Sequence, residues 1–181
     1  MAKVTIKNID RLTRKLNNIA DLDIKDVVNK ATLMVHGQAK ELAPVGKGGG
    51  SGLAGSIRMK TKKTTTGYEG RVYTNQEYAM YVEFGTGIKG DGTYPYKIEG
   101  LNLTYEDNPW FIPADKISKD IAEKYHFIKV HGKNGSEYYI SYGQKAQPFM
   151  YPALKRNEKA IYKLFKEGVK SELYKVSKGG Q

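Results

Sequence analysis

Residues 78–92 read YAMYVEFGTGIKGDG, and the way this stretch folds decides what kind of protein the chain is. Tyr78, Tyr81 and Val82 lie three and four positions apart, which predicts a short helix that ends at Gly85. The glycines at 85, 87 and 90 also spell G-x-G-x-x-G, the pattern of a dinucleotide-binding turn. The stretch is therefore either a cofactor site or a structural corner.

The residues that follow favour the corner. A dinucleotide-binding turn needs a strand before it and a helix after it, whereas residues 91–95 read DGTYP and break helices. Glycine accounts for 20 of the 181 residues, so the pattern arises easily by chance. We therefore expect no cofactor, and we expect Gly85 and Gly87 to adopt positive φ angles at a sharp exit from the helix.

Local patterns on either side of this stretch predict further elements. Apolar spacing predicts a short helix over 9–19 and a second helix of about 20 residues that Asp23 caps and Pro44 ends. Residues 53–60 are expected to be extended and to pair with 68–74 in a hairpin. A last helix is expected from Pro152 to Lys175. Its expected apolar side consists of Leu154, Ile161, Leu164, Phe165 and Val169.

Residues 88–145 differ in character, because they are rich in Gly, Tyr, Pro and Asp and have no long helical period. We interpret them as an insertion with a helical turn or two near 114–124. The Asn134-Gly135 pair predicts a hairpin within 126–142. The glycine-rich stretch 46–52 is expected to be a flexible loop, since its lysine stands too early for a phosphate-binding P-loop.

The composition favours contact with other macromolecules. A net charge of +11 suits an acidic partner, either nucleic acid or a protein with a negative face, although a lysine-rich soluble surface explains it about as well. Arg58, Lys60, Lys62 and Lys63 are the candidate contacts to DNA or to an acidic partner. No sequence-reading motif accompanies them, so such contact would be non-sequence-specific. The 14 tyrosines suit a surface that another protein buries.

Nothing in the chain assembles into a recognisable reactive or metal-binding motif. There is no cysteine, and His36, His126 and His131 lack metal-ligand spacing. Ser51 and Ser56 do not lie in G-x-S-x-G. No pattern brings Glu41 and Glu83 together, and both are expected to be solvated. We expect no catalysis, no metal, no signal peptide and no membrane-spanning segment.

Four segments in order resemble the small tail-component family of tailed bacteriophages, the neck, tail-completion and head–tail joining proteins. They are a helix that ends in APV, a glycine loop with LAGSI, the run NQEYAMYVEFGT, and QPFMYPAL before the last helix. The matching positions are Ala43, Pro44 and Val45; Gly52, Leu53, Ser56 and Ile57; Asn75, Tyr78, Ala79, Tyr81, Val82, Glu83, Phe84, Gly85 and Thr86; Gln147, Pro148, Phe149, Pro152, Ala153 and Leu154.

This resemblance implies an α+β fold: a small antiparallel sheet packed against a long helix and a C-terminal helix. We expect a single domain, with a core of 24–87 and 146–175, the insertion 88–145 and a frayed tail 176–181. The expected fold anchors are Phe84, Gly85, Pro148, Phe149 and Pro152. The expected subunit or partner contacts are Tyr78, Tyr81, Tyr138, Tyr139 and Tyr142.

The resemblance also implies a role without catalysis, in the virion, for a chain made in the host cytoplasm. The implied partners are further copies in a ring and the neighbouring head-closure, tail-terminator and tail-tube proteins, with DNA in the channel as a further candidate. Tail completion, head closure and tail termination are all open at this point, as are six and twelve copies. A non-sequence-specific nucleic-acid-binding protein is the alternative.

Overall fold

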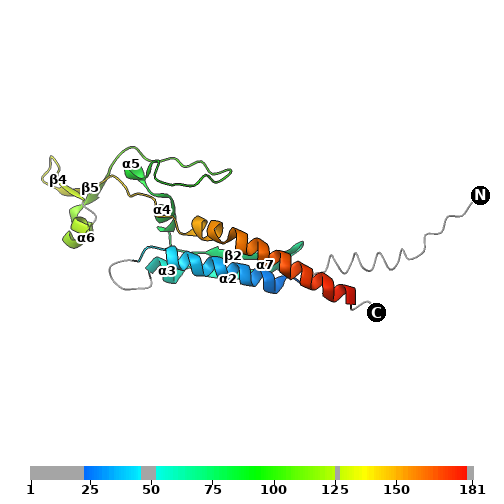
Figure 1. The fold of residues 1–181 in the computed structure, drawn as a ribbon. Coiled ribbons are helices and arrows are strands. Elements are labelled where there is room, and N and C mark those ends of the chain that lie inside the picture. Colours follow the sequence, from blue (N-terminus) through cyan, green and yellow to red (C-terminus); the bar gives the residue numbers. More distant parts are fainter. Residues whose placement is uncertain (1–22, 46–51, 125–126, 179–181) are drawn as a thin grey trace, which may run out of the picture. The chain divides into compact units, whose positions relative to one another are not determined.

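The computed structural model describes residues 23–45, 52–124 and 127–178 and combines helices with two small antiparallel sheets (Figure 1). The predicted α+β class is confirmed. The predicted helix 9–19, most of the glycine-rich loop, Ser51 and His126 lie outside the described residues. Contacts divide the chain into two compact units, one from 1–41, 57–73 and 152–181 and the other from 42–56 and 74–151. These boundaries differ from the predicted core and insertion, and the single domain stays a prediction.

The first unit begins with helix α2, Lys25–Leu42. Asp23 Oδ1 accepts the backbone N–H of Lys25 at 3.0 Å, so Asp23 caps the helix as predicted. The helix ends two residues before Pro44, which cannot continue it. It buries the side chains of Val28, Ala31, Thr32 and Ala39. The first long helix was therefore predictable from its cap, its apolar period and its terminating proline.

A hairpin packs against α2. Strand β1, Arg58–Thr64, pairs with β2, Gly67–Tyr73, and Thr64 lies opposite Gly67 at the turn. A side chain at Gly70 would collide with Thr32 Oγ1, and Thr61 Oγ1 donates to Asn29 Oδ1 at 3.3 Å. The face of the hairpin that carries Thr61 and Gly70 therefore lies on α2, and the opposite face does not.

The prediction of extended structure over 53–60 is wrong for its first half. Helix α3 spans Gly52–Ser56, and only from Arg58 is the chain a strand. Ser56 Oγ donates to the carbonyl of Leu53 at 2.6 Å, and the Leu53 side chain is buried. This local bond closes a helical turn, which is the alternative that serine offers to an extended backbone.

Helix α7, Met150–Lys178, is ~43 Å long at 1.5 Å per residue. Pro152 stands in its first turn, as predicted. Gly168 lies against Val27 of α2 so closely that a side chain there would collide with it. Leu154 was expected on the apolar side but is exposed, because the fully buried position in this turn belongs to Ala153. Ile161, Leu164, Phe165 and Val169 are half-buried.

The second unit holds the short helices α4, Ala79–Phe84, and α5, Gly87–Gly90, and a three-stranded sheet. The sheet consists of β3, Trp110–Pro113, β5, Glu137–Ser141, and β4, Ile128–His131, in the order β3-β5-β4. Between β3 and β4 lie the turn η1, Ala114–Lys116, and helix α6, Lys119–Lys124. The predicted β4–β5 hairpin and the helical turns are confirmed. Strand β3 had no prediction.

Of the helices in the described ranges, none combines the length and the apolar character that a membrane crossing requires.

Candidate assembly surface

The corner after α4 is held by a second segment of the chain. Helix α4 ends at Gly85, and the extended Thr86 then forms a bridge with Gln144. Thr86 N–H donates to Gln144 O at 2.9 Å, and Gln144 N–H donates back to Thr86 O at 3.0 Å. Gln147 N–H donates to Val82 O at 2.8 Å. The G-x-G-x-x-G pattern thus follows a helix and not a strand, which removes the context that a dinucleotide turn requires.

The glycines of this corner are needed because backbone segments pass very close to them. Gly85 and Gly87 have φ angles of 81° and 60°, which confirms the predicted positive values. A Cβ at Gly85 would lie 2.8 Å from Ala146 N, and one at Gly87 would lie 2.7 Å from Tyr142 O. A Cβ at Gly143 would overlap the carbonyl of Thr86. Any side chain at these positions would push the two segments apart.

Glu83 lies inside this corner and is only 5% exposed. Its Oε2 accepts the backbone N–H groups of Phe149 at 2.7 Å and Met150 at 2.8 Å, and its Oε1 accepts that of Tyr151 at 3.1 Å. These donors are at the start of α7, where N–H groups lack partners within the helix and the dipole favours negative charge. The expectation that Glu83 is solvated is therefore wrong.

A sequence signal for this role existed but was indirect. The residues just before α7 are Gln147, Pro148 and Phe149, and none of them is a usual N-cap residue. A long helix without a local cap needs acceptors from elsewhere in the chain. Glu83 supplies them from a position 66 to 68 residues earlier.

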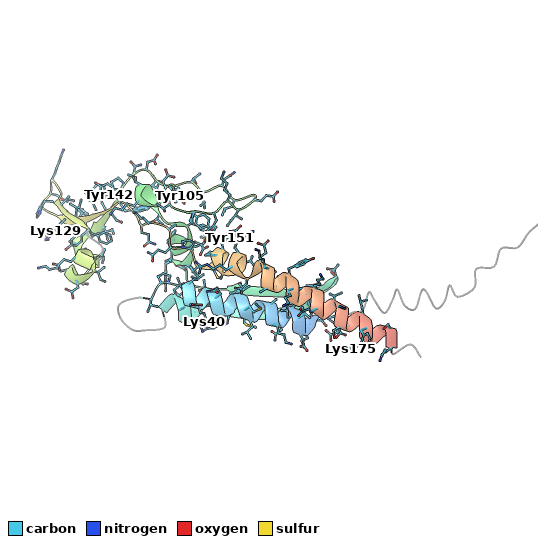
Figure 2. All side chains as sticks on the ribbon, viewed as in Figure 1. Lys40, Tyr105, Lys129, Tyr142, Tyr151 and Lys175 are labelled. Atoms are coloured by element: carbon cyan, nitrogen blue, oxygen red, sulfur yellow. The ribbon has the colours of Figure 1, made fainter. Side chains whose placement is uncertain are left out.

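The predicted fold anchors lie at or next to this corner. Phe149 is among the largest fully buried side chains, Gly85 and Pro152 are buried, and Phe84 and Pro148 are half-buried. Phe84 begins a series of ring contacts that continues through Tyr94 and Tyr96 to Tyr151, with centroids 5.0 to 5.6 Å apart. Tyr142 and Tyr105 lie by α5 (Figure 2), and Tyr105 donates to Phe84 O at 2.9 Å.

Tyr94 is the member of this aromatic series whose hydroxyl group is buried. This hydroxyl has no hydrogen-bond partner within the described part of the chain. Burial raises the pKa of Tyr94 well above its ordinary value of 10.0, and the negative charge of Glu83 raises it further. The neutral phenol is therefore the form that this site holds.

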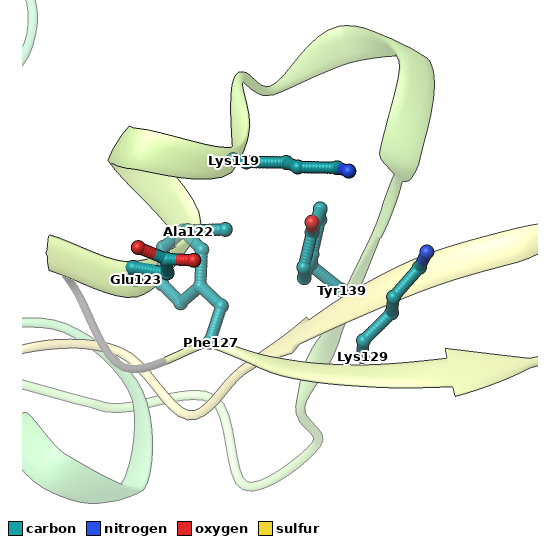
Figure 3. A pocket seen from close by; sticks show the side chains of 6 residues that line it. All are labelled: Lys119, Ala122, Glu123, Phe127, Lys129 and Tyr139. Carbon is teal, nitrogen blue, oxygen red and sulfur yellow. The ribbon is translucent and has the colours of Figure 1, made fainter.

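The predicted contact tyrosines fall into two groups. Tyr78, which precedes α4, and Tyr81 on α4 are exposed, and Met80 between them in the sequence is 64% exposed. Tyr138 and Tyr142 are half-buried, whereas Tyr139 is only 7% exposed. Tyr139 lines a hollow of about 580 Å³ between α6 and the sheet, and Figure 3 shows it standing between Lys119 and Lys129. Tyr139 therefore packs within its own unit.

The register of the sheet explains this split, because residues opposite each other point to the same face. Tyr139 lies opposite Ile112 and Lys129, on the face that α6 covers. Lys129 Nζ lies 2.8 Å from Glu137 Oε2 on this face, and the hydrogen bond lowers the pKa of Glu137. The other face carries six uncharged residues: Phe111, Pro113, Ile128, Val130, Tyr138 and Ile140. We call these six the apolar sheet face.

The candidate basic residues lie on different faces of the β1–β2 hairpin. Arg58, Lys60 and Lys62 point away from α2, on the same face as Arg71, whereas Lys63 shares the face of Thr61 and Gly70. Glu69 forms ion pairs with Lys62 at 3.2 Å and with Arg71. One carboxylate among four cations leaves this face positive. We call Arg58, Lys60, Lys62 and Arg71 the basic hairpin face.

The remaining candidates for chemistry are not brought together. His36 is partly buried and its Nε2 donates to Ile57 O at 3.2 Å, and Ser56 Oγ lies 2.6 Å from Thr74 Oγ1. Within the residues that the structure describes, no three or more His, Asp or Glu side chains are grouped to hold a metal ion. The polar side chains of His36 and Ser56 form hydrogen bonds within the fold, so the arrangement offers surfaces for contact.

Comparison with protein families gives a match to the N-terminal part of the chain. Residues 4–85 match the HK97-gp10-like family, described as "Bacteriophage HK97-gp10, putative tail-component". The resemblance to the tailed-phage tail-component family is confirmed. The match runs from before α2 to Gly85 and includes α4, while the segment 146–154 lies outside it. A structural protein of a tailed phage, located in the virion, is thereby supported. No curated protein and no solved structure matches the chain.

Proposed function

We propose that this tail component completes the tail or joins it to the head by oligomerising in the neck of the particle. The observation that carries the proposal is the surface of α4, which lies inside the family-matched range. Met80 and Tyr81 on the helix and Tyr78 just before it are exposed, although they are the residue types that protein interfaces favour. Helix α4 is held in place by the Glu83 corner, so these side chains are presented from a fixed base.

The proposed assembly is a ring of identical subunits, with six copies as the first expectation and twelve as the alternative. Its neighbours in the neck would be head-closure, tail-terminator and tail-tube proteins. The basic hairpin face would meet an acidic face of one of them or the DNA in the channel. A catalytic role is not part of the proposal, because the family is one of structural components.

Mass spectrometry of purified virions tests this function, together with micrographs of particles made without the protein. We expect the chain in mature virions at about 6 to 12 copies, the size of a single closed ring. Particles made without it should accumulate as separate heads and tails. Absence of the chain from purified virions, or normal infectious particles without it, would reject the proposal.

A second candidate function is non-sequence-specific binding of nucleic acid. The basic hairpin face favours it, because Arg58, Lys60, Lys62 and Arg71 point the same way with one acidic residue among them. Binding of random-sequence duplex DNA should then weaken linearly with the logarithm of salt concentration. Replacing Arg58, Lys60 and Lys62 by serine should reduce that slope by about 3, because each lost phosphate contact contributes about 0.9. Salt-dependent binding by a monomer that is missing from virions would favour this function over assembly.

A further inference from the structure

The apolar sheet face is partly exposed, which is unusual for a small antiparallel sheet: Val130, Tyr138 and Ile140 are half-buried, and Phe111, Pro113 and Ile128 are exposed. Phe111, Ile140 and Ile128 lie side by side across the three strands, and Pro113, Tyr138 and Val130 form the next row. None of the six is charged, and Phe111 and Ile128 are 59% and 54% exposed. A sheet with one solvated face normally presents polar side chains there.

The opposite face already has its cover. Helix α6 buries Ala122 and Tyr139 against the sheet, and the charged side chains Lys129 and Glu137 lie at the rim of that contact. The charged residues of the sheet therefore lie on the covered side, and the apolar ones lie on the open side. Contiguous exposed apolar surface of this kind marks a contact with another molecule.

The face, and not an edge, is suited to that contact. Strands β3 and β4 form the two edges and have only four residues each. Pro113 in β3 has no N–H to donate, and β4 carries Lys129 and His131. Short edges with proline or charge discourage strand addition. The contact should therefore be made by side chains of the face.

The net charge of the chain limits which class of partner can cover the apolar sheet face. An acidic protein or a nucleic acid would be drawn to the basic hairpin face, because the apolar sheet face offers it no counter-charge. Copies of a chain with net charge +11 repel one another, so they meet most favourably where neither contributes a charge. The apolar sheet face meets that condition, which makes a second copy the best occupant.

A ring requires two different surfaces on each subunit, because head-to-tail contacts are heterologous. A second surface with exposed uncharged side chains in the same unit is that of α4, where Met80 and Tyr81 are 64% and 55% exposed. A helix laid on a sheet is a standard packing of secondary structure. Building on the proposed assembly function, we propose that the apolar sheet face of one copy packs against the Tyr78, Met80 and Tyr81 surface of the next copy.

The area of the two surfaces determines the expected affinity of the contact between two copies. A stable interface buries about 800 Å² on each partner, whereas each large aromatic side chain contributes only about 150 to 250 Å². The three side chains of Tyr78, Met80 and Tyr81 therefore fall short of a standard interface. A single contact should be weak, with a dissociation constant of roughly tens to hundreds of micromolar, and closure of the ring should strengthen it.

A mixing experiment with two variants of the full chain tests the proposal. The double variant Phe111→Ser/Ile128→Ser removes the sheet surface and keeps α4, while Met80→Ser/Tyr81→Ser does the reverse. Sedimentation velocity should find the unmodified chain self-associating at up to about 1 mM, and each variant alone monomeric. An equimolar mixture should form one-to-one dimers and nothing larger, because only one intact pair of surfaces remains. Tyr162→Ser, at an exposed position on α7, is the control and should associate like the unmodified chain.

Three results would overturn the inference. Self-association of the Met80→Ser/Tyr81→Ser variant alone would mean that two sheet faces meet each other. Unchanged association of both variants would place the contact elsewhere. A monomeric unmodified chain up to about 1 mM would mean that another protein covers the face. In each case, detection of the chain in virions would leave the proposed function standing, whereas its absence from virions would reject that function on separate grounds.

Hydroxyl-radical footprinting of the unmodified chain provides the same test without any variant. The reactivity of Phe111, Met80 and Tyr81 should fall together as the protein concentration rises. Tyr162 should keep its reactivity and serves as the internal control. Protection of only one of the two surfaces, or of neither, would contradict the proposed contact.

Discussion

The Glu83 corner and the three-stranded sheet belong to the same unit. The corner buries a charged side chain, whereas the sheet exposes apolar ones. In the corner a carboxylate is turned inward and three backbone N–H groups satisfy it. In the sheet, the apolar side chains of Phe111 and Ile128 are turned outward and remain more than half exposed. Glu83 lies within the range that matches the family model, whereas its donors at 149–151 and the whole sheet lie outside that range. The corner therefore uses a buried polar group to hold the fold, while the sheet leaves apolar side chains exposed.

The largest loss of stability should come from the substitution Glu83→Ala. It would leave the N–H groups of Phe149, Met150 and Tyr151 without their acceptor, in a buried position, and should lower the free energy of unfolding by about 3 kcal/mol or more. Urea denaturation followed by circular dichroism measures this change. Glu77→Ala, an exposed acidic position near α4, is the control and should change stability by less than about 0.5 kcal/mol. Equal effects of the two substitutions would show that Glu83 does not hold the corner.

Gly143→Ala should be the next most damaging change. Gly143 has a φ angle of 86°, and a Cβ there would overlap the carbonyl of Thr86. We expect a loss of roughly 2 to 3 kcal/mol from backbone strain together with displacement of Thr86. Gly92→Ala shares a positive φ angle, 65°, but its Cβ would meet open space, so it should cost only about 1 kcal/mol. Thermal and urea denaturation measure both changes. If the two substitutions lower the free energy of unfolding equally, close approach of the two segments is not the reason that position 143 requires glycine.

Tyr94→Phe should stabilise the protein by about 1 kcal/mol, because it removes a buried hydroxyl that has no partner. The effect should grow in alkali. Since the pKa of Tyr94 is raised in the folded state, the unfolded chain loses this proton first as the pH passes 10.0. The contribution of the neutral phenol is complete below that pH and is lost above it, towards the folded pKa. Urea midpoints at pH 8 and pH 11 for both proteins provide the measurement, and a variant that is less stable at both would contradict the assignment.

The smallest effect on stability should come from Phe111→Ser/Ile128→Ser, which removes two large apolar side chains. Because both are more than half exposed, we expect a change within about 1 kcal/mol for the monomer, against 2 to 5 kcal/mol for core positions of this size. Phe149→Ala, at a fully buried position, is the matched comparison. A loss of several kcal/mol from the double variant in dilute solution would mean that the apolar sheet face is covered by its own chain.

Local patterns were sufficient for part of this structure. The helix cap at Asp23, the exit at Gly85 and the Asn134-Gly135 turn each depend on residues within a few positions, and each was predicted. Strand β3 was not, because four residues that end in proline resemble a loop until β5 provides a partner. The inward orientation of Glu83 depends on donors 66 to 68 positions away, which no local pattern reveals.

The sequence suggested candidate contact residues by their type, but it did not show which face of the sheet each one occupies. Tyr138 and Tyr139 are neighbours in the sequence, and in a strand they point to opposite faces, so only the register decides which one is available. The register brings Tyr138 to the apolar sheet face and Tyr139 beneath α6. Phe111 and Ile128 had no prediction because their exposure follows from the same register.

An electron cryomicroscopy reconstruction of the intact particle tests the central claim most directly. We predict a ring of this chain at the junction of head and tail, in which Phe111 and Ile128 of each copy are covered by Met80 and Tyr81 of the next. A ring in which the apolar sheet face remains open to solvent would contradict the contact. A particle without this chain at its neck would contradict the account as a whole.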